Sequence, residues 1–305
     1  MFVVDTHCDT LWKYAVQGAE RSAPCVTPET LKKGGVTVQV CALFAGSDGP
    51  QGKNERAPQN VAAAELAALP KLTGAGVRQV DSPFEANEGE TCLMLSIEGA
   101  EVFGDSLERL RELRRRGVRL CALTWNHENL LAYPHCAQGH RGLKPFGWEC
   151  VREMEALGVA VDVSHLGEGG FWDLMFHAAK PPMASHSCCR TLCEKTRNLT
   201  DDQIRALIEC GGWIGVNFYT AFINGSARCT LDELCDHFVH IAELGGVKHM
   251  GFGSDFDGIE TAPQGLESPA DLPRLMEMLR LRGFSADEVE GIAGRNFLEY
   301  FRAFE

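Results

Sequence analysis

Short apolar runs of strand length recur along the chain, and amphipathic segments separate them. The apolar runs cover residues 2–7, 37–44, 92–97, 119–124, 159–164, 182–186, 213–218 and 248–254. Segments with helical periodicity cover 59–72, 106–116, 148–157, 201–210, 231–244 and 270–280. Alternation of this kind predicts βαβ units and a parallel sheet. Eight repeats without a change in composition favour a closed (β/α)8 barrel, the TIM barrel, over an open doubly wound sheet.

The whole chain, residues 1–305, is expected to form one α/β domain. A barrel of this type usually has about 250 residues, which leaves room for long loops. Loops rich in Gly, Pro and polar residues follow several of the predicted strands, at 46–58, 133–147, 221–230 and 257–268. In a barrel such loops form the rim of the active site. Residues 287–301 are predicted to form an extra C-terminal helix packed on the outside.

Polar side chains stand at the ends of five of these strands. They are His7 and Asp9, Glu98, His165, His186 and Asp255. The C-terminal ends of parallel strands gather at one face of a barrel, so these side chains are expected to converge there. Imidazole together with carboxylate suits zinc, with manganese or cobalt as substitutes. The pattern predicts a metal hydrolase.

Each of these residues also has a structural interpretation. Glu98 alone could be a loop or N-cap carboxylate, although its two oxygens could instead bridge two ions about 3.5–4 Å apart. A lone histidine at a strand end is usually a satisfied polar residue, but His165 and His186 end consecutive strands. Asp255 is expected to be catalytic, and Asp257, in the same turn-rich segment, to be structural.

Two further roles need candidates. An arginine after the His186 strand could bind a substrate carboxylate through two parallel hydrogen bonds, and spacing alone does not choose between Arg190 and Arg197. A polar residue after the fourth strand is expected to polarise a substrate carbonyl, and His127 is favoured for that role.

The amino-acid composition limits the kinds of partner that the protein is expected to bind. A net charge of −13 and a pI near 5.3 argue against nucleic acid and anionic membranes, both of which call for basic patches. The chain opens without a basic, apolar leader and has no apolar stretch long enough to span a bilayer, so a cytoplasmic location is expected. Thirteen scattered cysteines, several inside apolar runs, are expected to be reduced thiols.

Several ordered motifs then point to one family. They are Asp5-Thr6-His7-Cys8-Asp9, Ser96-Ile97-Glu98-Gly99, Gly142-Leu143-Lys144-Pro145-Phe146-Gly147, Asp162-Val163-Ser164-His165, Ser185-His186-Ser187, Arg197-Asn198 and Gly253-Ser254-Asp255-Phe256-Asp257-Gly258. In these motifs, over nearly the whole chain, the sequence resembles the renal (membrane) dipeptidase family of zinc peptidases, and within it a soluble bacterial-type member.

The resemblance implies a (β/α)8 barrel that holds two Zn²⁺ ions. His7 and Asp9 would bind one ion, His165 and His186 the other, and Glu98 would bridge them. Arg197 would bind the carboxylate of a dipeptide, and Asp255 would lie near the amine and the transferred proton. A hydroxide between the metals would attack the peptide carbonyl, and a D-residue at the C-terminal position is a possible substrate feature. A homodimer is also implied.

The chain departs from the family pattern at Trp125, where the family often has histidine. His127 or Asn126 is then left to supply the missing donor. A second hypothesis is another amidohydrolase-type metal hydrolase, acting on lactones, cyclic amides or phosphotriesters, but such relatives typically carry His-x-His on the first strand. A third is a metal-binding scaffold that has lost turnover.

Overall fold

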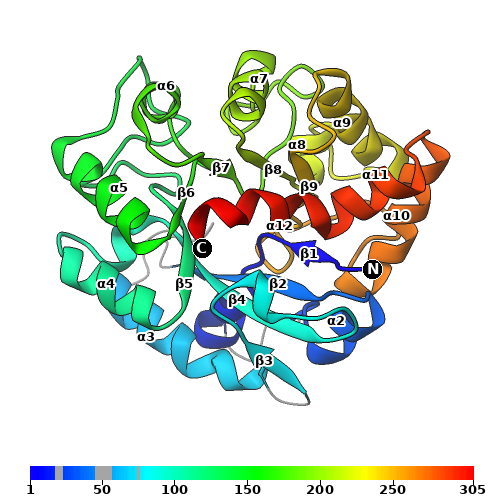
Figure 1. Ribbon diagram of the computed structural model, residues 1–305, viewed down its shortest axis with the longest axis horizontal. Coiled ribbons are helices and arrows are strands. Elements are labelled where there is room, and N and C mark those ends of the chain that lie inside the picture. The colour runs from blue at the N-terminus through cyan, green and yellow to red at the C-terminus, as the bar shows by residue number, and fades with distance from the viewer. Residues whose placement is uncertain (18–22, 45–56, 74–75) are drawn as a thin grey trace.

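Parallel strands close into a barrel that is ringed by helices (Figure 1). The computed structural model describes residues 1–17, 23–44, 57–73 and 76–305. Its strands are β1 (Val4–Asp5), β2 (Val38–Phe44), β3 (Val77–Gln79), β4 (Thr91–Glu98), β5 (Val118–Ala122), β6 (Ala160–Asp162), β7 (Met183–Ala184), β8 (Trp213–Val216) and β9 (Met250–Phe252). Hydrogen bonds join them in the order β2-β1-β9-β8-β7-β6-β5-β4, and pairing of β2 with β4 closes the ring. The predicted barrel is confirmed.

Strand β3 is a short addition that the sequence pattern did not predict. It pairs with residues 91–93 of β4, and β5 takes over the same edge of β4 from Leu95 onward. Its three residues read buried, exposed and half-buried, which is too short a run for periodicity to reveal. Strands β1, β6, β7, β8 and β9 are two to four residues shorter than predicted. The ladder of β1 with β2, for example, covers only Val4 and Asp5.

The described helices are α1 (Thr10–Trp12), α2 (Pro28–Lys33), α3 (Pro58–Ala68), α4 (Leu107–Arg115), α5 (Pro145–Leu157), α6 (Glu168–His177), α7 (Asp201–Glu209), α8 (Thr220–Ile223), α9 (Leu231–Glu243), α10 (Leu272–Leu281), α11 (Ala286–Glu290) and α12 (Asn296–Phe301). The six predicted amphipathic segments match α3, α4, α5, α7, α9 and α10 to within four residues at each end, whereas α1, α2, α6 and α8 were not among those segments. Capping boxes start α7 at Thr200 and α9 at Thr230, which explains why both begin where the pattern placed them. Among the described helices, none has the length and apolar character needed to cross a bilayer.

The interior of the barrel is apolar at one end and polar at the other. Alternate residues of a strand share a face, and on β4 that face reads Cys92, Met94, Ser96 and Glu98. Cys92 and Met94 pack in a buried cluster with residues of the other strands and of α12. The carboxylate of Glu98 therefore lies at the C-terminal end of β4, beyond the apolar side chains that fill the barrel interior.

Residues 286–301 are helical, as predicted for 287–301, but this helix does not pack beside the helices that ring the barrel. Helix α12 instead covers the N-terminal end of the barrel, and Phe297 and Phe301 are fully buried in the cluster that fills the barrel interior (Figure 1). Covering that end removes apolar strand side chains from water, which an outer position would not do. Arg119 of β5 fastens the end of the chain by donating to the carbonyl oxygens of Gly158 at 2.9 Å and Phe304 at 2.8 Å.

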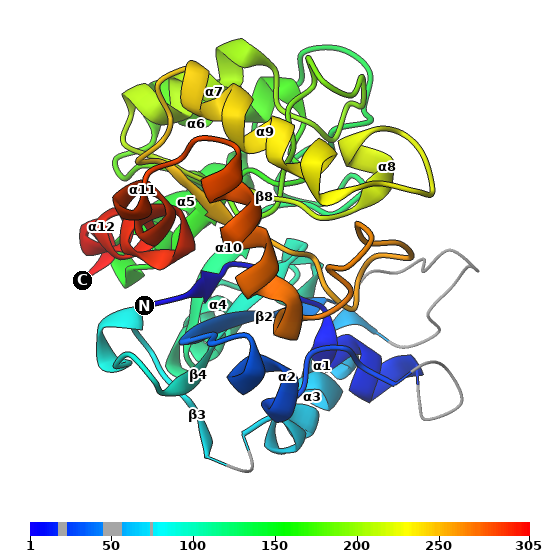
Figure 2. The same ribbon diagram turned by 90° about the vertical axis from the view of Figure 1, so that its right-hand side faces the viewer.

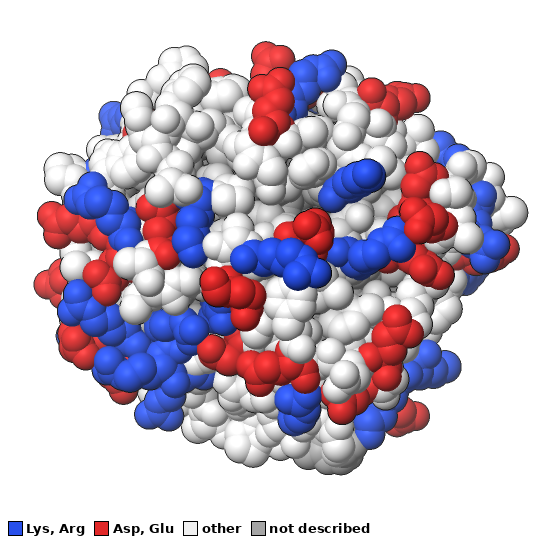
Figure 3. Space-filling view, in the orientation of Figure 1, with Lys and Arg blue, Asp and Glu red and all other residues white. Residues whose placement is uncertain are grey.

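Charged side chains of both signs are interspersed over this covered end (Figure 3). The arginines of α4 pair with nearby acids, with Arg111 2.7 Å from Glu153 and Arg115 2.9 Å from Glu108. This face therefore shows a mixed surface over the closed end of the barrel.

The opposite end of the barrel carries the loops that follow the strands (Figure 2). Helices α1 and α8 lie at that end, whereas α11, α12 and both termini lie at the other. Of the predicted rim loops, 133–147 is free of helix up to α5, whereas 221–230 begins inside α8. Residues 46–56 of the first loop lie outside the described residues. All thirteen cysteines are free thiols, as expected.

Candidate metal centre

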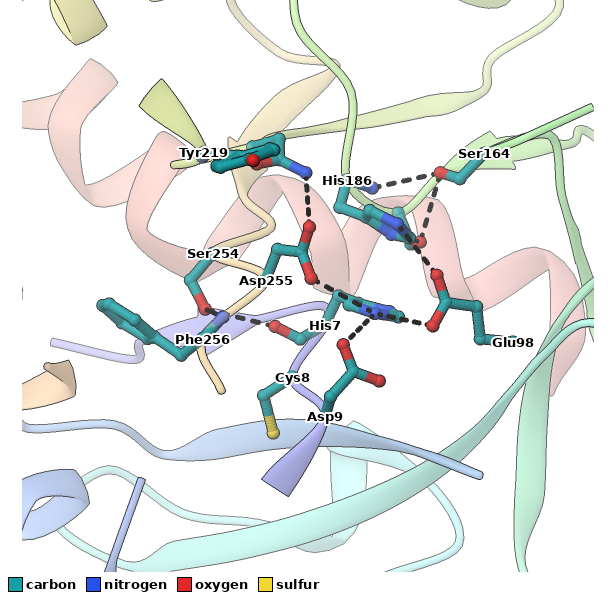
Figure 4. A network of polar contacts seen from close by, with 12 residues as sticks. His7, Cys8, Asp9, Glu98, Ser164, His186, Tyr219, Ser254, Asp255 and Phe256 are labelled. Carbon is teal, nitrogen blue, oxygen red and sulfur yellow. Dashed lines mark hydrogen bonds and ion pairs between the residues drawn. The ribbon is translucent and has the colours of Figure 1, made fainter. Parts of the chain in front are cut away.

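The carboxylate of Glu98 contacts three histidines in the barrel mouth, and Figure 4 shows it beside His7 and His186. Its Oε1 atom is 2.8 Å from Nε2 of His165 and 3.4 Å from Nε2 of His186. The two imidazole nitrogens are 3.1 Å apart. Three atoms that carry lone pairs thus converge on one point, from the ends of β4, β6 and β7.

Hydrogen bonds on the far side of each imidazole decide which nitrogen carries the proton. Nδ1 of His186 is 2.7 Å from the hydroxyl of Ser185, which in turn donates to the buried carboxylate of Asp162. Because that hydroxyl donates to Asp162, it accepts from Nδ1 of His186 and leaves Nε2 with a free lone pair. Asp162 therefore orients a candidate ligand through Ser185.

A second group of ligand atoms surrounds His7 on the other side of Glu98. Nε2 of His7 is 3.5 Å from Oδ2 of Asp9, 3.6 Å from Oε2 of Glu98 and 3.9 Å from Oδ1 of Asp255. The ring of His7 stacks on that of His186, with centroids 3.8 Å apart. The two oxygens of Glu98 therefore face different groups of nitrogen and oxygen ligands (Figure 4).

Burial dominates the electrostatics of both groups. Burial, together with the charge of Arg197, lowers the pKa of His165 to about 3. Burial also lowers the pKa of His186, whereas at His7 the charges of Glu98 and Asp9 outweigh burial and raise the pKa well above its usual value. The imidazoles of His165 and His186 are thus neutral, the form that binds metal.

The pKa values of the carboxyl groups are likewise raised at some residues and lowered at another. Burial, with the charge of Glu98, raises the pKa of Asp9 well above its usual value, and burial raises that of Asp255 to about 6. Burial would also raise the pKa of Glu98, but the charge of His7 and hydrogen bonds from the histidines hold it well below its usual value. Packing acids this closely calls for positive charge between them.

The residues present fit divalent metal ions. The groups His7–Glu98–His186 and His7–Asp9–Asp255 each offer ligand atoms within 4.8 Å of one another. Among the described residues, Nε2 of His7 and Oδ1 of Asp9 are buried and have no hydrogen-bond partner. A buried polar atom without a partner costs free energy, and a metal ion supplies one. Imidazole and carboxylate ligands are those that zinc accepts, and manganese and cobalt also bind such sets.

Arg197 and Arg190 have different environments, and this separates the two candidates. The guanidinium of Arg190 donates to the main-chain oxygens of Lys195, Thr196 and Asn198, so it holds the loop in place. Arg197 donates from Nη1 to Ser187 at 3.0 Å, while its Nε and Nη2 are buried and lack a partner among the described residues. Arg197 lines a cavity of about 240 Å³ together with His165 and Ser187. Its remaining donors can bind an anionic group there.

Asp255 and His165 share an unusual backbone conformation. Their φ angles are 63° and 67°, and Asp257 is the third non-glycine residue with positive φ among those described. Such a conformation costs free energy and tends to occur at functional sites. Asn217, at the end of β8, donates to Oδ2 of Asp255 at 2.9 Å and so orients its other oxygen toward His7. Asp257 accepts from Thr10 and Lys13, in keeping with the structural role expected for it.

His127 is the one predicted site residue that the structure leaves outside the cluster. It is exposed on the rim, with its ring centroid 5.5 Å from that of Trp125. Its role as a carbonyl donor stays a prediction. Sequence reasoning did not single out Ser185, Asn217 or His135, which contact the candidate ligands or their partners. Neither strand position nor spacing distinguishes them from other polar residues.

Comparison with known proteins identifies relatives of the chain. The chain is 37% identical over 226 residues to an uncharacterised dipeptidase of Schizosaccharomyces pombe, covering 72% of this chain but only 54% of the yeast protein. It is 32% identical over 255 residues to an uncharacterised protein of Klebsiella pneumoniae, covering 78% of this chain and 94% of that one. The chain thus spans about half the length of the yeast relative and nearly all of the bacterial one.

Among solved structures, a metallopeptidase of Rhodobacter sphaeroides liganded with a phosphinate mimic of the dipeptide L-Ala-D-Ala has the same fold. Its TM-score is 0.89 at 24% identity, covering 100% of this chain and 99% of that one. The family model described as membrane dipeptidase (peptidase family M19) matches residues 1–305. The chain therefore belongs to the membrane dipeptidase family, peptidase family M19.

Proposed function

We propose that the protein is a binuclear zinc dipeptidase. The observation that carries the proposal is the position of Glu98, whose Oε1 faces His165 and His186 while its Oε2 faces His7. A carboxylate placed between two ligand groups is suited to bridge two ions. Membership of the membrane dipeptidase family supports the same activity.

His7 and Asp9 would hold one ion, His165 and His186 the other, and Glu98 both. Two such ions, when bound, would lower the pKa of a bound water and would polarise a carbonyl oxygen. Manganese or cobalt would serve as substitutes, since the ligands are nitrogen and oxygen atoms.

Arg197 would bind the free carboxylate of the substrate. Its Nε and Nη2 form part of a rigid fork that matches the two oxygens of a carboxylate, and both lack a partner among the described residues. Burial makes this interaction strong, because water does not screen it. The charge of Arg197 acts on His165 and His186, so the carboxylate would lie on that side of Glu98.

Asp255 would act on the other side, near His7. Since its pKa lies at about 6, its carboxyl group is mostly ionised near neutral pH and can take up a proton and pass it to the leaving amine. A carboxylate clamp on one side and an acid on the other limit the substrate to about two residues. The phosphinate mimic of L-Ala-D-Ala on the Rhodobacter protein supports including C-terminal D-residues among the substrates.

Hydrolysis of a dipeptide panel tests the proposal. Zinc-loaded and chelator-stripped protein would be compared on L-L and L-D dipeptides, with a tripeptide and an N-acetylated dipeptide as controls. We expect cleavage of free dipeptides only, and only with metal. Cleavage of the tripeptide at a similar rate would contradict the role of Arg197 and Asp255. Cleavage of lactones or cyclic amides instead of dipeptides would support the second class of hydrolase.

A further inference from the structure

A chain of hydrogen bonds runs from the loop that carries Arg197 to the candidate ligand His165. The hydroxyl of Thr196 is 2.8 Å from Nδ1 of His135. Nε2 of His135 is 3.1 Å from Oδ1 of Asn126, and the same oxygen is 2.8 Å from Nδ1 of His165. The four side chains come from three loops of the rim.

The direction of each hydrogen bond follows from what His165 must do. To bind metal through Nε2, His165 must carry its proton on Nδ1 and donate it to Asn126. The amide oxygen of Asn126 has two lone pairs, so it also accepts from Nε2 of His135. His135 then carries its proton on Nε2, and its Nδ1 accepts from the hydroxyl of Thr196. Both ring nitrogens of His135 therefore take part in this series of hydrogen bonds.

The same segments also hold the main chain of His165. The main-chain N–H of His135 donates to the carbonyl oxygen of His165 at 2.7 Å, and the hydroxyl of Thr124 donates to it at 3.1 Å. His165 has a φ of 67°, a conformation that needs support from its surroundings. At the other end, Arg190 fixes Thr196 by donating to its carbonyl oxygen at 2.9 Å.

We propose that Asn126 and His135 form a relay that positions His165 for metal binding and links it to the carboxylate-binding loop. The inference rests on the proposed function, since it assumes that His165 is a ligand and Arg197 the carboxylate clamp. Asn126 and His135 are positioning residues, which act through His165 and Thr196. Movement of the loop on binding a carboxylate would pass through His135 and Asn126 to the ligand.

Asn126→Leu removes the acceptor while keeping a similar side-chain volume. With cobalt in place of zinc, we expect affinity for one of the two ions to fall by about 10–100-fold, measured by competition with a coloured chelator. The visible absorption bands of bound cobalt should change, because the ring of His165 is no longer held. Asn126→Asp keeps an acceptor oxygen and should restore most of the affinity and the spectrum.

Two further variants complete the test. His135→Phe removes the middle of the relay but leaves Asn126, and should shift the cobalt spectrum in the same direction by a smaller amount. Asn87→Ala is the matched control, since Asn87 is exposed and its side-chain amide donates to Glu90 at 3.3 Å, away from the relay. Circular dichroism would show that each variant is folded, and we expect the control to match the unaltered protein.

The relay is contradicted if folded Asn126→Leu binds two cobalt ions with unchanged affinity and spectrum, or if Asn126→Asp restores neither. These readouts need no turnover. Unaltered protein that binds two cobalt ions but cleaves no dipeptide would contradict the proposed function alone, and the relay would still be decided by the spectra. Addition of an acetylated amino acid as a carboxylate probe should alter the cobalt spectrum of the unaltered protein more than that of His135→Phe.

Discussion

Each oxygen of Glu98 faces a different group of ligands, with Oε1 2.8 Å from Nε2 of His165 and Oε2 3.6 Å from Nε2 of His7. Glu98→Gln keeps the shape of the side chain but replaces one carboxylate oxygen with an amide NH2 group, which does not bind a metal ion. We therefore expect bound zinc to fall from two ions to one or none. The rate of dipeptide cleavage should fall by about 10³-fold or more, because in the proposed mechanism both ions would act on the transition state. Metal analysis of the purified, folded variant measures this. Two zinc ions retained per chain would contradict the bridging role.

Arg197 is the residue that should distinguish a free carboxylate from a blocked one. Arg197→Met removes the buried fork and should reduce kcat/KM for a dipeptide by roughly 10²-fold or more, since a lost charged hydrogen bond costs about 2–5 kcal/mol. The corresponding dipeptide amide lacks the carboxylate that Arg197 would bind, so its residual cleavage should be slow in both proteins and should change little, which makes it the internal control. Arg197→Lys should recover only part of the loss, because an ammonium group does not form two parallel hydrogen bonds. Equal losses on both substrates would argue against the clamp.

The residues at strand ends could be predicted from sequence because the barrel itself brings them together. His7, Asp9, Glu98, His165, His186 and Asp255 all follow apolar runs, and parallel strands end on one face. Side chains on the long loops could not be placed in this way. His127 and His135 both lie in the loop that follows β5. His127 is exposed, whereas His135 lies against Asn126, and no sequence periodicity predicts that difference.

At the scale of single elements, the turn after β9 brings the chain back against β1. Asp255 and Asp257 both have positive φ there, and Gly258 lies so close to the cluster that a Cβ on it would overlap Oδ2 of Asp9. We expect Gly258→Ala to displace Asp9 and to lower zinc affinity as well as activity. Gly211→Ala is the control, since a Cβ there meets nothing within 4 Å and only its φ of 77° is disfavoured. Unchanged zinc binding in Gly258→Ala would show that the turn can move away.

The bounds of an element were predicted well where burial sets the pattern of apolar residues. They were predicted poorly where contacts with residues far away in the sequence decide where the element ends. Strand β4 is buried throughout and was predicted to within one residue at each end, whereas β1 leaves its ladder with β2 after Asp5. After that point Thr6 donates its hydroxyl to the carbonyl oxygens of Ser185 and Phe252, which no apolar pattern predicts. Helix α12 looked like an ordinary amphipathic segment, and its place across the barrel end depends on the open apolar interior that it covers.

At the scale of the whole molecule, Arg119 joins the closed end of the barrel to the C-terminus. It is almost fully buried, and it donates to Gly158, Asp81 and Phe304, the last of which closes the chain over the barrel. Arg119→Met leaves these oxygens without their donor, so we expect about 2–4 kcal/mol of lost stability and a lower Tm. Activity at low temperature should remain, because the site lies at the opposite end.

A matched variant separates this effect from the loss of charge. Arg302→Met removes an exposed ion pair of 3.0 Å to Glu299 and should change stability by less than about 1 kcal/mol. Urea unfolding of both variants measures the difference. Equal, small effects would show that the C-terminal segment does not depend on Arg119.

The proposed two-metal dipeptidase is tested most directly by returning zinc to stripped protein in steps while following cleavage of a dipeptide. If both ligand groups around Glu98 are needed, cleavage should rise with added zinc until two ions per chain are bound and then level off. The Glu98→Gln variant should not recover under the same additions. Full activity at one ion per chain, or two bound ions with no cleavage of any dipeptide, would contradict the account.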